Sequence, residues 1–394
     1  MTMAAAMEGR TADVRSTAGR IARVDILDDL DAAETIWRSL EAQQPFLTPY
    51  QRFDFLAAWQ RRVGEHERTS PFIVVATDAE RRPLLLLPLA LSRACGVRIA
   101  SFMGGKHTTF NMALWDRGFA TTATAADLAA LLSGLRAHAA VDALALTRQP
   151  LRWRDWANPF ALLPHQPSVN GCPVLDIAPG SAPAALISNS FRRRLKSKER
   201  KLQALSGFRH HVAGDDAEAG RLLDWFFRVK PLRMAEQRLP NVFADPGVED
   251  FIRDICNAVT PDGRRLVDIH ALECDEEVIA LFAGVADGHR FSMMFNTYTL
   301  SEHARYSPGL ILIRTIVDHY AARGFRALDL GIGSDEYKRL FCKTDDPIFD
   351  SFLALSDRGR IAAAAMAAVA RFTQLVKQNQ LLLGLARKLR GALG

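Results

Sequence analysis

The stretch Arg305-Tyr-Ser-Pro-Gly-Leu310 opens an apolar helix, which runs to a glycine stop and leads into Asp329-Leu-Gly-Ile-Gly333. Ser307 suits the N-cap of this helix, and Pro308 suits its first position, where a missing N–H costs nothing. Apolar residues then recur at three- and four-residue spacing, and Gly324 suits the C-terminal stop. The start and the end of this helix are therefore predicted to the residue.

The start of this helix also suits an anion. The first backbone N–H groups of a helix lack intrahelical partners, and together with the helix dipole they attract a phosphate. Gly309 carries no side chain that would keep a ligand away from the backbone. We therefore expect a phosphate-bearing cofactor at this place.

The composition is that of a globular chain. Its 394 residues are 48% hydrophobic and 24% charged, which suffices for a sizeable core and is typical of two domains. The five cysteines stand far apart, with neither a CxxC pair nor a histidine at ligand spacing. We expect no metal site and a reduced, cytoplasmic setting.

The net charge of +6 is concentrated in two segments. Residues 181–210 carry eight lysines and arginines against one glutamate, and residues 356–394 carry seven against one aspartate. Because the rest of the chain is acidic overall, we expect no nucleic-acid partner but two places where anions dock. The second segment is also Ala-rich and amphipathic. It suits a peripheral contact with an anionic inner membrane, and packing on its own domain is the alternative.

The chain divides most clearly at Ala-Pro-Gly-Ser-Ala-Pro, residues 178–183, whose composition is typical of a linker. Strand-like and helix-like runs alternate on both sides of it, and the two sides have the character of diverged copies although no long repeat is visible. We expect a flexible N-terminal extension, two α/β units and a basic Ala-rich helical tail, at residues 1–21, 22–177, 178–355 and 356–394.

The second unit has the sharper pattern. A basic helix, a short strand and two helices come first, and three strands follow in a meander with turns at Cys274-Asp-Glu276 and Asp287-Gly288. These strands are predicted at Arg265–Glu273, Glu277–Ala286 and Arg290–Tyr298. The helix from Pro308, a strand at Arg326–Leu330, a short helix and a last strand at Phe349–Leu355 complete the order.

This order of elements resembles the acyl-CoA-dependent N-acyltransferases of the GNAT superfamily. The closer resemblance is to a bacterial branch named for cellulose-biosynthesis acetyltransferases (CelD/BcsL), which is similar to the tandem-domain Fem aminoacyl transferases. It is carried by Tyr306-Ser-Pro-Gly-Leu310, Ala321-Ala-Arg-Gly324, Leu328-Asp-Leu-Gly-Ile-Gly333, Glu336-Tyr-Lys338 and Phe191-Arg-Arg-Arg-Leu195. The resemblance implies an α/β (α+β) fold of two GNAT-like units, each a mixed, mostly antiparallel sheet flanked by helices, with a C-terminal helical tail.

The resemblance also implies a V-shaped opening between the fourth and fifth strands. There the pantetheine of acetyl-CoA or another acyl-CoA would lie, with its pyrophosphate on the amides of the Pro308 helix. Ile311 stands where the superfamily pattern has a second small residue. Aminoacyl-tRNA, the donor of the Fem relatives, stays open as an alternative. The residues implied for the cofactor are Phe295, Asn296, Arg305, Tyr306, Ser307, Pro308, Gly309, Leu310 and Lys338.

Acyl transfer requires an acceptor positioned against a thioester, a proton for the leaving group and a polarised carbonyl. Tyr337 is the first candidate to protonate the leaving thiolate, because the matching family motif keeps a Tyr-Lys pair and a phenol is a suitable weak acid. Glu273, at the end of a central strand, and Asp329 are candidate bases. The alternatives are an aromatic packing role for Tyr337 and turn or salt-bridge roles for the two acids.

Candidate substrate residues lie on two helices. The basic helix with Arg192 and Arg193 has a narrow apolar stripe, and its charges suit an anionic cell-envelope or exopolysaccharide precursor, or the 3′-phosphate of the cofactor. Trp225, Arg228 and Arg233 lie on the next long helix, which is amphipathic, and its arginines are expected to face the cleft. Solvated arginines and a core tryptophan are the alternative interpretation.

Two other functions compete with acyl transfer. Asp329-Leu-Gly-Ile-Gly333 also looks like the glycine loop of a Rossmann methyltransferase, but that fold needs several further βα units and only about 60 residues remain. Glu336 also stands where a dinucleotide loop has its third glycine. The second alternative is a catalytically degenerate GNAT fold that binds a glycan or a partner of a polysaccharide export system through its basic helix and tail.

Overall fold

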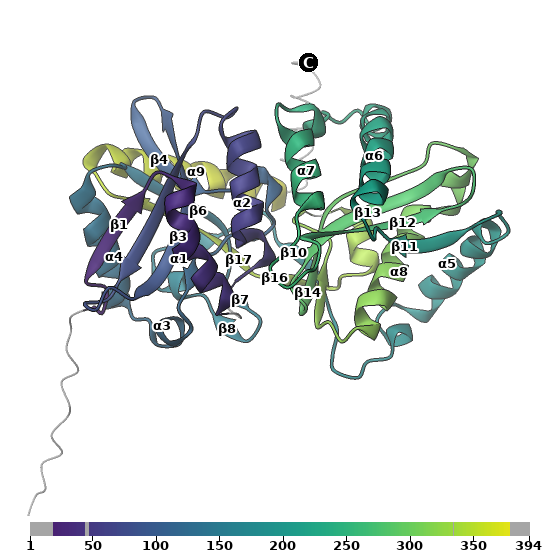
Figure 1. Cartoon of the computed structure of the whole chain (residues 1–394), viewed down its shortest axis with the longest axis horizontal. Helices are drawn as coiled ribbons and strands as arrows, with labels where there is room; N and C mark the ends of the chain where they lie inside the picture. The colour runs from purple at the N-terminus through teal and green to yellow at the C-terminus, as the bar shows by residue number, and fades with distance from the viewer. Residues whose placement is uncertain (1–18, 44–46, 334, 379–394) are drawn as a thin grey trace, which may run out of the picture.

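Two α/β units lie side by side (Figure 1), and the computed structural model describes residues 19–43, 47–333 and 335–378 of the chain. Each unit is built on one large sheet, and a small hairpin pairs β7 (Arg152–Trp153) with β8 (Trp156–Ala157). The tandem α/β arrangement expected from the sequence is confirmed.

The sheet of the first unit is antiparallel except for one pair of strands. Its strand order is β1-β2-β3-β4-β6-β17-β9, and β5 pairs with β3. The strands β4 and β6 run parallel, because the chain crosses over between them through two helices. The strands are β1 (Arg23–Leu27), β2 (Ser70–Thr77), β3 (Pro83–Ala94), β4 (Val97–Phe102), β5 (Leu114–Trp115), β6 (Ala143–Pro150), β9 (Gln166–Pro167) and β17 (Ile348–Ala354).

The sheet of the second unit has the order β11-β12-β13-β14-β15-β10-β16. Here β14 and β15 are the parallel pair, and one helix makes the crossover. The predicted meander is confirmed to within two residues. The strands are β10 (Cys172–Asp176), β11 (Arg209–Val212), β12 (Val267–Glu273), β13 (Val278–Ala286), β14 (Arg290–Tyr298), β15 (Ala327–Asp329) and β16 (Thr344–Asp346).

The two sheets follow one plan and exchange one strand. In each, an antiparallel meander leads through a helical crossover to a parallel neighbour. The next strand comes from the other half of the chain, because β17 lies beside β6 and β10 lies beside β15. The expected boundaries at 177/178 and 355/356 are therefore corrected, since each assigned a strand to the wrong sheet. The composition of a strand does not predict which of two sheets it joins, because the free edge of either sheet offers the same backbone hydrogen-bonding groups.

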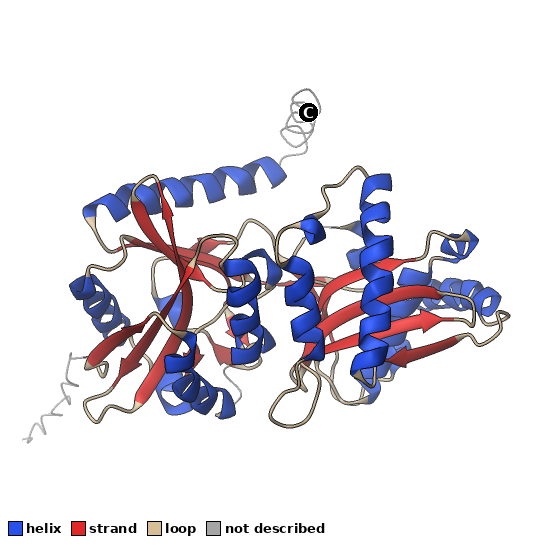
Figure 2. Ribbon diagram, turned by 45° about the horizontal axis from the view of Figure 1, so that its top comes forward, coloured by secondary structure: helices blue, strands red, loops and turns tan. Residues whose placement is uncertain are grey.

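Helices cover both faces of the second sheet (Figures 1 and 2). The helices α6 and α7 pack on one face, and α8, backed by α5, packs on the other. In the first unit, α1 packs on β1–β3, and α9 lies along β4, β6 and β17. The helices are α1 (Leu30–Ala42), α2 (Phe53–Trp59), α3 (Arg117–Thr122), α4 (Ala125–His138), α5 (Asn189–Leu202), α6 (Asp216–Glu236), α7 (Val248–Asn257), α8 (Pro308–Ala322) and α9 (Asp357–Gln378).

Helix α8 begins and ends as predicted. Pro308 occupies its first position, and Gly324 follows the last turn with a positive φ of 77°. Ser307 is the N-cap, but its backbone is left-handed (φ 56°, ψ 51°) and its hydroxyl does not cap the helix. The expected side-chain cap is therefore corrected, because that backbone conformation is not the extended one in which a serine reaches the first amides.

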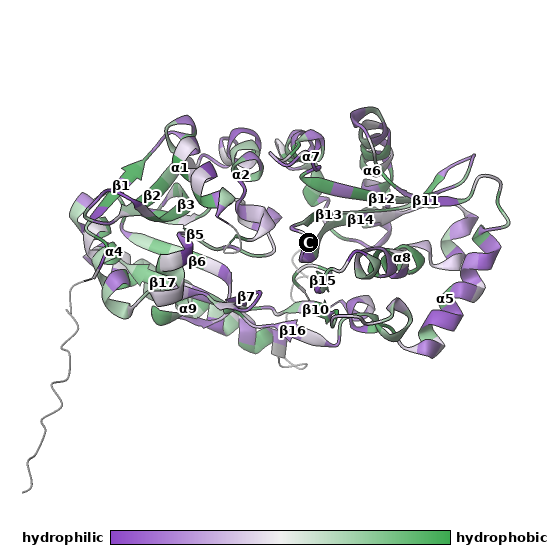
Figure 3. Cartoon of the chain, turned by 60° about the horizontal axis from the view of Figure 1, so that its bottom comes forward, coloured by the Kyte–Doolittle hydropathy of each residue, from purple (hydrophilic) through white to green (hydrophobic). Residues whose placement is uncertain are grey.

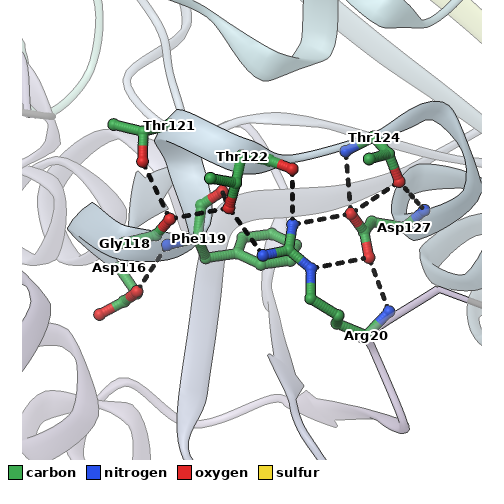
Figure 4. Close-up of polar contacts among 8 residues, drawn as sticks. All are labelled: Arg20, Asp116, Gly118, Phe119, Thr121, Thr122, Thr124 and Asp127. Carbon is green, nitrogen blue, oxygen red and sulfur yellow. Dashed lines mark hydrogen bonds and ion pairs between the residues drawn. The ribbon is translucent and has the colours of Figure 1, made fainter. Parts of the chain in front are cut away.

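Arg20 fastens the start of the first unit to α4 (Figure 4). Its guanidinium donates to the Asp127 carboxylate (2.9 Å) and to Thr122 Oγ1 (2.7 Å), and its backbone N–H also donates to Asp127 (2.6 Å). Asp127 forms a capping box with Thr124 at the same time. Residues 19–21 of the expected flexible extension are therefore held in place, and residues 1–18 lie outside the described residues.

The two units share a core. Phe55 on α2 and Phe251 on α7 meet edge to face, with ring centroids 5.3 Å apart, inside one apolar cluster that runs through both units. Arg62 pairs with Asp254 across the same interface at 2.7 Å. Because the apolar cluster is continuous, the relative position of the units is fixed by packing as well as by polar contacts.

Arg290 is buried at the start of the parallel pair. Its Nε donates to the Asp329 carboxylate at 2.7 Å, its Nη1 pairs with Asp346, and its guanidinium lies 4.5 Å from the centroid of the Phe110 ring of the first unit. Burial alone would lower the pKa of Arg290, but the charges of Asp329 and Asp346 raise it above its ordinary value. This one side chain therefore joins β14, β15, β16 and the first unit.

Asp329→Asn is expected to destabilise the protein by roughly 3 kcal/mol, because it leaves a buried guanidinium without its main counter-charge. Asp224→Asn is the matched control, since Asp224 is an exposed partner of Arg253 at 2.8 Å and its loss should cost less than about 1 kcal/mol. Chemical denaturation measures both. Equal losses for the two variants would contradict the account of Arg290.

Three histidines are packed between β11, β12 and α8. His210 contacts His270 through ring nitrogens 3.2 Å apart, His270 contacts the Tyr320 hydroxyl at 3.0 Å, and His319 lies edge-on to both histidines. Burial, followed by the neighbouring positive charges, lowers the pKa of His210 and of His319 to about 4 and that of His270 well below its ordinary value.

This histidine cluster predicts a loss of stability in mild acid. Histidines of the unfolded chain bind a proton near pH 6.5, whereas folded His210 and His319 bind one only near pH 4. The unfolded state therefore takes up more protons between these two pH values. The melting temperature should fall by several degrees as the pH drops from 6.5 towards 4. His319→Gln should show a shallower fall, and an unchanged slope in this variant would refute the assignment.

Candidate active site

The parallel pair β14–β15 separates after a short stretch. Its register pairs Arg290 with Ala327 and Ser292 with Asp329, and then β15 ends while β14 continues to Tyr298. In the described part of the chain, β14 has no partner strand on that edge beyond Ser292, and side chains of α6 donate to its carbonyls at Asn296 and Tyr298. The opening that the resemblance implies between the fourth and fifth strands would begin where this pairing ends.

A hollow of about 560 Å³ lies between the end of β14 and the start of α8, and we call it the β14–α8 hollow. Asn296, Tyr298, Ser307, Gly309 and Leu310 line it together with the C-terminal part of α6. Of the residues expected at the cofactor, Asn296, Ser307, Gly309 and Leu310 are thus brought together. Arg305 instead points to Glu302 (3.0 Å) and to the Tyr306 hydroxyl (2.9 Å).

Among the described residues, the start of α8 leaves one amide, that of Gly309, without a backbone acceptor rather than a row of them. The N–H groups of Leu310 and Ile311 both donate to the Ser307 carbonyl, and the Ser307 N–H donates to that of Ala304. Pro308 has none. The N–H of Gly309 donates to no other backbone group of the described chain. An anion at this helix start would therefore be bound mainly by Gly309, which also lines the hollow.

Two cations, Lys230 and Arg233, line this hollow, and a third contacts Ser307 beside it. Lys198 on α5 donates to Ser307 Oγ at 2.7 Å. Lys230 and Arg233 on α6 donate to the carbonyls of Asn296 (2.9 Å) and Tyr298 (3.2 Å) on the open edge of β14. Burial lowers the pKa of Lys230. Lys198 therefore adds positive charge at the start of α8, and Lys230 and Arg233 add it along β14. Such charge would attract a phosphate group.

A second hollow, of about 510 Å³, lies between the two units, and we call it the interdomain hollow. Its apolar wall comes from α7, β14 and the loop after β15, with Phe251, Met293 and Leu330 among its members. Its polar wall comes from the first unit. The residues on that wall are Lys106, His107, Thr108, Thr109, Arg148 and Asn170.

Tyr337 and Asp335 line both hollows. Burial, followed by the charge of Asp335, raises the pKa of the Tyr337 phenol above its ordinary value, and a hydrogen bond with the Asn296 side chain opposes this only in part. The phenol is therefore protonated at every physiological pH and can donate its proton or a hydrogen bond. The proposed acid thus stands at the junction of the two hollows, next to an exposed carboxylate.

Lys338 does not face the cofactor position. It is buried, and its ammonium donates to the carbonyls of Gly331 (3.1 Å) and Ile332 (3.0 Å) and lies 3.3 Å from Asp335. Gly331 has a positive φ of 74°, which a glycine adopts at little cost. The expected cofactor role of Lys338 is therefore corrected: it fixes the loop that carries Asp335 and Tyr337.

The two expected bases are engaged elsewhere. Asp329 is fully buried and accepts from Arg290 and Ser292 on one oxygen and from the Gly331 N–H on the other. Glu273 is buried between Arg209 and Arg221, with the Arg221 pair at 3.0 Å. Neither lines a hollow with Tyr337, so both expected base roles are corrected to structural ion pairs.

The expected substrate residues are dispersed. Trp225 and Arg228 line a different hollow of about 480 Å³ beside Glu273. Arg192 is buried and pairs with Asp318 at 2.8 Å, which ties α5 to α8. Arg193 is exposed on α5, the strongly hydrophilic helix at the outer edge in Figure 3. Of this set only Arg233 borders the β14–α8 hollow.

The first unit supplies groups that the sequence did not single out. Trp59 donates to His107 Nδ1 at 3.1 Å, so the proton of the neutral ring sits on Nε2. Burial, followed by the charge of Lys106, lowers the pKa of His107 to about 4. Arg148, at a φ of 58°, donates to the carbonyls of Gly105 and Thr108 and thereby holds this loop at the interdomain hollow.

Asp335 and Lys198 were also missed. A signal for Asp335 was present, since it stands two residues before Tyr337 in the loop after β15. Lys198 stands within a run of basic residues in which nothing distinguishes it. Its contact with Ser307 depends on how α5 lies across the start of α8, which only the tertiary structure shows.

Comparison with known sequences assigns the second unit. Residues 189–339 match the family model described as an acetyltransferase (GNAT) domain. This range contains β14, α8, β15 and Tyr337, which form the opening described above. A search of curated protein sequences found no significant match.

Solved structures share the whole tandem fold. FemX superposes with a TM-score of 0.54 at 10% identity, covering 80% of this chain and 95% of its own. A conserved protein from Bacteroides thetaiotaomicron superposes with a TM-score of 0.54 at 11% identity, covering 84% and 99%. The C-terminal domain of a protein from Agrobacterium fabrum, described as a lysylphosphatidylglycerol synthetase, gives 0.52 at 10% identity, covering 87% and 97%.

These matches define a class for one part of the chain. Residues 189–339 match a GNAT acetyltransferase domain, and the tandem fold around them is shared with the superposed structures. At identities near 10% the structural likeness shows the fold alone.

Proposed function

We propose that the protein is an acyl-CoA-dependent N-acyltransferase. In this proposal acetyl-CoA or another acyl-CoA occupies the β14–α8 hollow, and the acceptor amine or hydroxyl enters through the interdomain hollow. The observation that carries it is the position of Tyr337 and Asp335, which line both hollows. A group transferred from one hollow to the other must pass these two side chains.

The donor side fits the chemistry of coenzyme A. Its pyrophosphate would be held by the Gly309 N–H and by Lys198, whose ammonium already lies 2.7 Å from Ser307 Oγ. The pantetheine arm would follow the open edge of β14 towards Tyr337, as amide groups do along an unpaired strand. Arg233 and Lys230 cover the carbonyls of that edge from α6.

In the transfer step one residue gives a proton and another takes one. The acceptor nitrogen attacks the thioester carbonyl carbon, the carbon–nitrogen bond forms and the carbon–sulfur bond breaks. The Tyr337 phenol gives its proton to the leaving thiolate. Asp335, which is exposed at the junction, takes the proton that the acceptor nitrogen loses.

We place the acceptor among cell-envelope or exopolysaccharide precursors, as the resemblance to the CelD/BcsL branch implies, and the enzyme in the cytoplasm. The polar wall of the interdomain hollow supports a polar, hydroxyl-rich or amine-bearing acceptor, because it presents Lys106, His107, Arg148 and Asn170. The apolar wall opposite them suits an acceptor that also has an apolar part.

Tyr337→Phe is expected to lower kcat by roughly 10²-fold with little change in KM for acetyl-CoA, because the phenyl ring fills the same space but donates no proton. Asp335→Asn should lower the rate most at low pH, where the acceptor amine is protonated. Release of free coenzyme A in the presence of small amines measures both. Unchanged rates in the two variants would disprove the assigned roles.

Gly309→Ala tests the donor side. An added Cβ would lie 3.6 Å from the Tyr298 ring, which is an ordinary contact, so the fold should tolerate it and gain up to about 1 kcal/mol from the helix. The methyl group would nevertheless cover the free amide and weaken binding of acetyl-CoA several-fold in calorimetry. Gly220→Ala on α6, with nothing within 4 Å of the added Cβ, is the matched control.

The same calorimetry separates the alternatives. Binding of acetyl-CoA or a longer acyl-CoA supports the transferase. Binding of an acidic polysaccharide without any acyl-CoA would indicate the degenerate binding protein. If only aminoacyl-tRNA served as a donor, the acyl-CoA assignment of the β14–α8 hollow would be wrong.

A further inference from the structure

Helix α9 exposes an apolar stripe that the proposed reaction does not use. Four large apolar side chains on it are exposed to 76%, 66%, 67% and 60%: Ile361, Val369, Phe372 and Leu375. Their spacing of eight, three and three residues places them on one side of a helix. Ala363, on the other side, is buried against the first sheet.

This stripe stands out from the rest of the surface. Among the described residues, ten large apolar side chains are exposed, and four of them lie on this one helix. The other six are dispersed over both units, which is normal for a soluble domain. A continuous apolar stripe on a helix that is already anchored on its opposite side indicates a docking surface.

The charges beside the stripe select the kind of partner. The described part of α9 carries Arg358, Arg360, Arg371 and Lys377 against the single acid Asp357. Arg360 is strongly exposed, and Arg371 donates to Gln166 beside the helix. A second copy of the same helix would bring like charges together, whereas an anionic surface would be attracted.

We propose that the exposed side of α9 binds the surface of an anionic lipid bilayer. The four apolar side chains would enter the interfacial layer while the flanking arginines contact lipid phosphates, which is the arrangement of an interfacial amphipathic helix. No described helix is long and apolar enough to cross a membrane. The contact is therefore a peripheral one, and it does not depend on the proposed transferase activity.

The position of α9 relates this surface to the interdomain hollow. At the C-terminal end of the helix, Lys377 donates to Asn170 Oδ1 at 2.9 Å, and Asn170 lines that hollow. The apolar residues Phe372 and Leu375 lie within two turns of Lys377 on the same helix. At about 100° per residue Lys377 points away from the stripe, so a bilayer on the stripe would lie across α9 from Asn170, about 10 Å from the edge of that hollow, where a membrane-borne acceptor is locally concentrated.

Flotation of the full chain with lipid vesicles tests the proposal. Vesicles of phosphatidylglycerol mixed with phosphatidylcholine should carry the protein, and vesicles of phosphatidylcholine alone should not. The double variant Phe372→Glu with Leu375→Glu should bind the anionic vesicles at least tenfold more weakly. Val259→Glu is the control, because Val259 is an exposed apolar residue of the second unit whereas α9 packs on strands of the first, and it should bind as the unchanged protein does.

Three outcomes would overturn the proposal. Full binding by the double variant would show that another segment, such as residues 379–394, makes the contact. Absence of binding to any vesicle, together with a dimer that the double variant abolishes in light scattering, would make the stripe an interface between copies. Equal binding to both vesicle types would exclude the electrostatic part. Melting curves verify that the variants are folded, and coenzyme A release with a water-soluble amine reports the transferase activity separately.

Discussion

The buried guanidinium of Arg290 is the constraint on which the arrangement of the site depends. It pairs with Asp329 on β15 and with Asp346 on β16, and it lies over an aromatic ring of the first unit. A charge in this position is tolerated only while its partners stay in place. One side chain therefore ties the start of β14 to its parallel neighbour β15, to β16 and to the first unit.

The pair of Arg290 with Asp329 joins β14 and β15 where they run side by side. Beyond Ser292 and Asp329 their pairing ends. The loop after β15 turns at Gly331, and the Lys338 ammonium donates to the carbonyls of Gly331 and Ile332. These bonds fix the loop in which Asp335 and Tyr337 line both hollows. The exchange of β10 and β17 then binds the two units into a single body around the opening. The interdomain hollow exists only because of this exchange and the shared core, since its two walls come from different units.

Local patterns in the sequence were sufficient for α8 and the meander of the second unit, but they missed short strands such as β5 and β9 and the partners of the exchanged strands. The start and end of α8 and the bounds of β14 follow from Pro308, Gly324 and the turn at Asp287-Gly288, whose effects act within a few residues. The strand exchange, by contrast, depends on which sheet edge is free, and no short-range signal records this. The expected side-chain cap by Ser307 failed because its backbone is left-handed, and its hydroxyl accepts instead from Lys198 on a distant helix.

The same limit applies to the site. Tyr337 and Gly309 were found because a motif places them next to a helix start or a turn, and the structure brings them to the hollows. Glu273 and Asp329 were chosen as bases by residue type, but in the structure Glu273 is buried between two arginines and Asp329 is buried against Arg290. His107 and Arg148 belong to a unit without a recognisable motif, and their position at the site follows only from the packing of one unit on the other.

A crystal structure of the full chain with bound coenzyme A tests this account most directly. We expect the pyrophosphate at the Gly309 N–H near Lys198, the pantetheine along β14 beyond Ser292, and the sulfur within hydrogen-bond distance of the Tyr337 hydroxyl. Coenzyme A in the hollow beside Glu273, or a sulfur directed away from Tyr337, would contradict it.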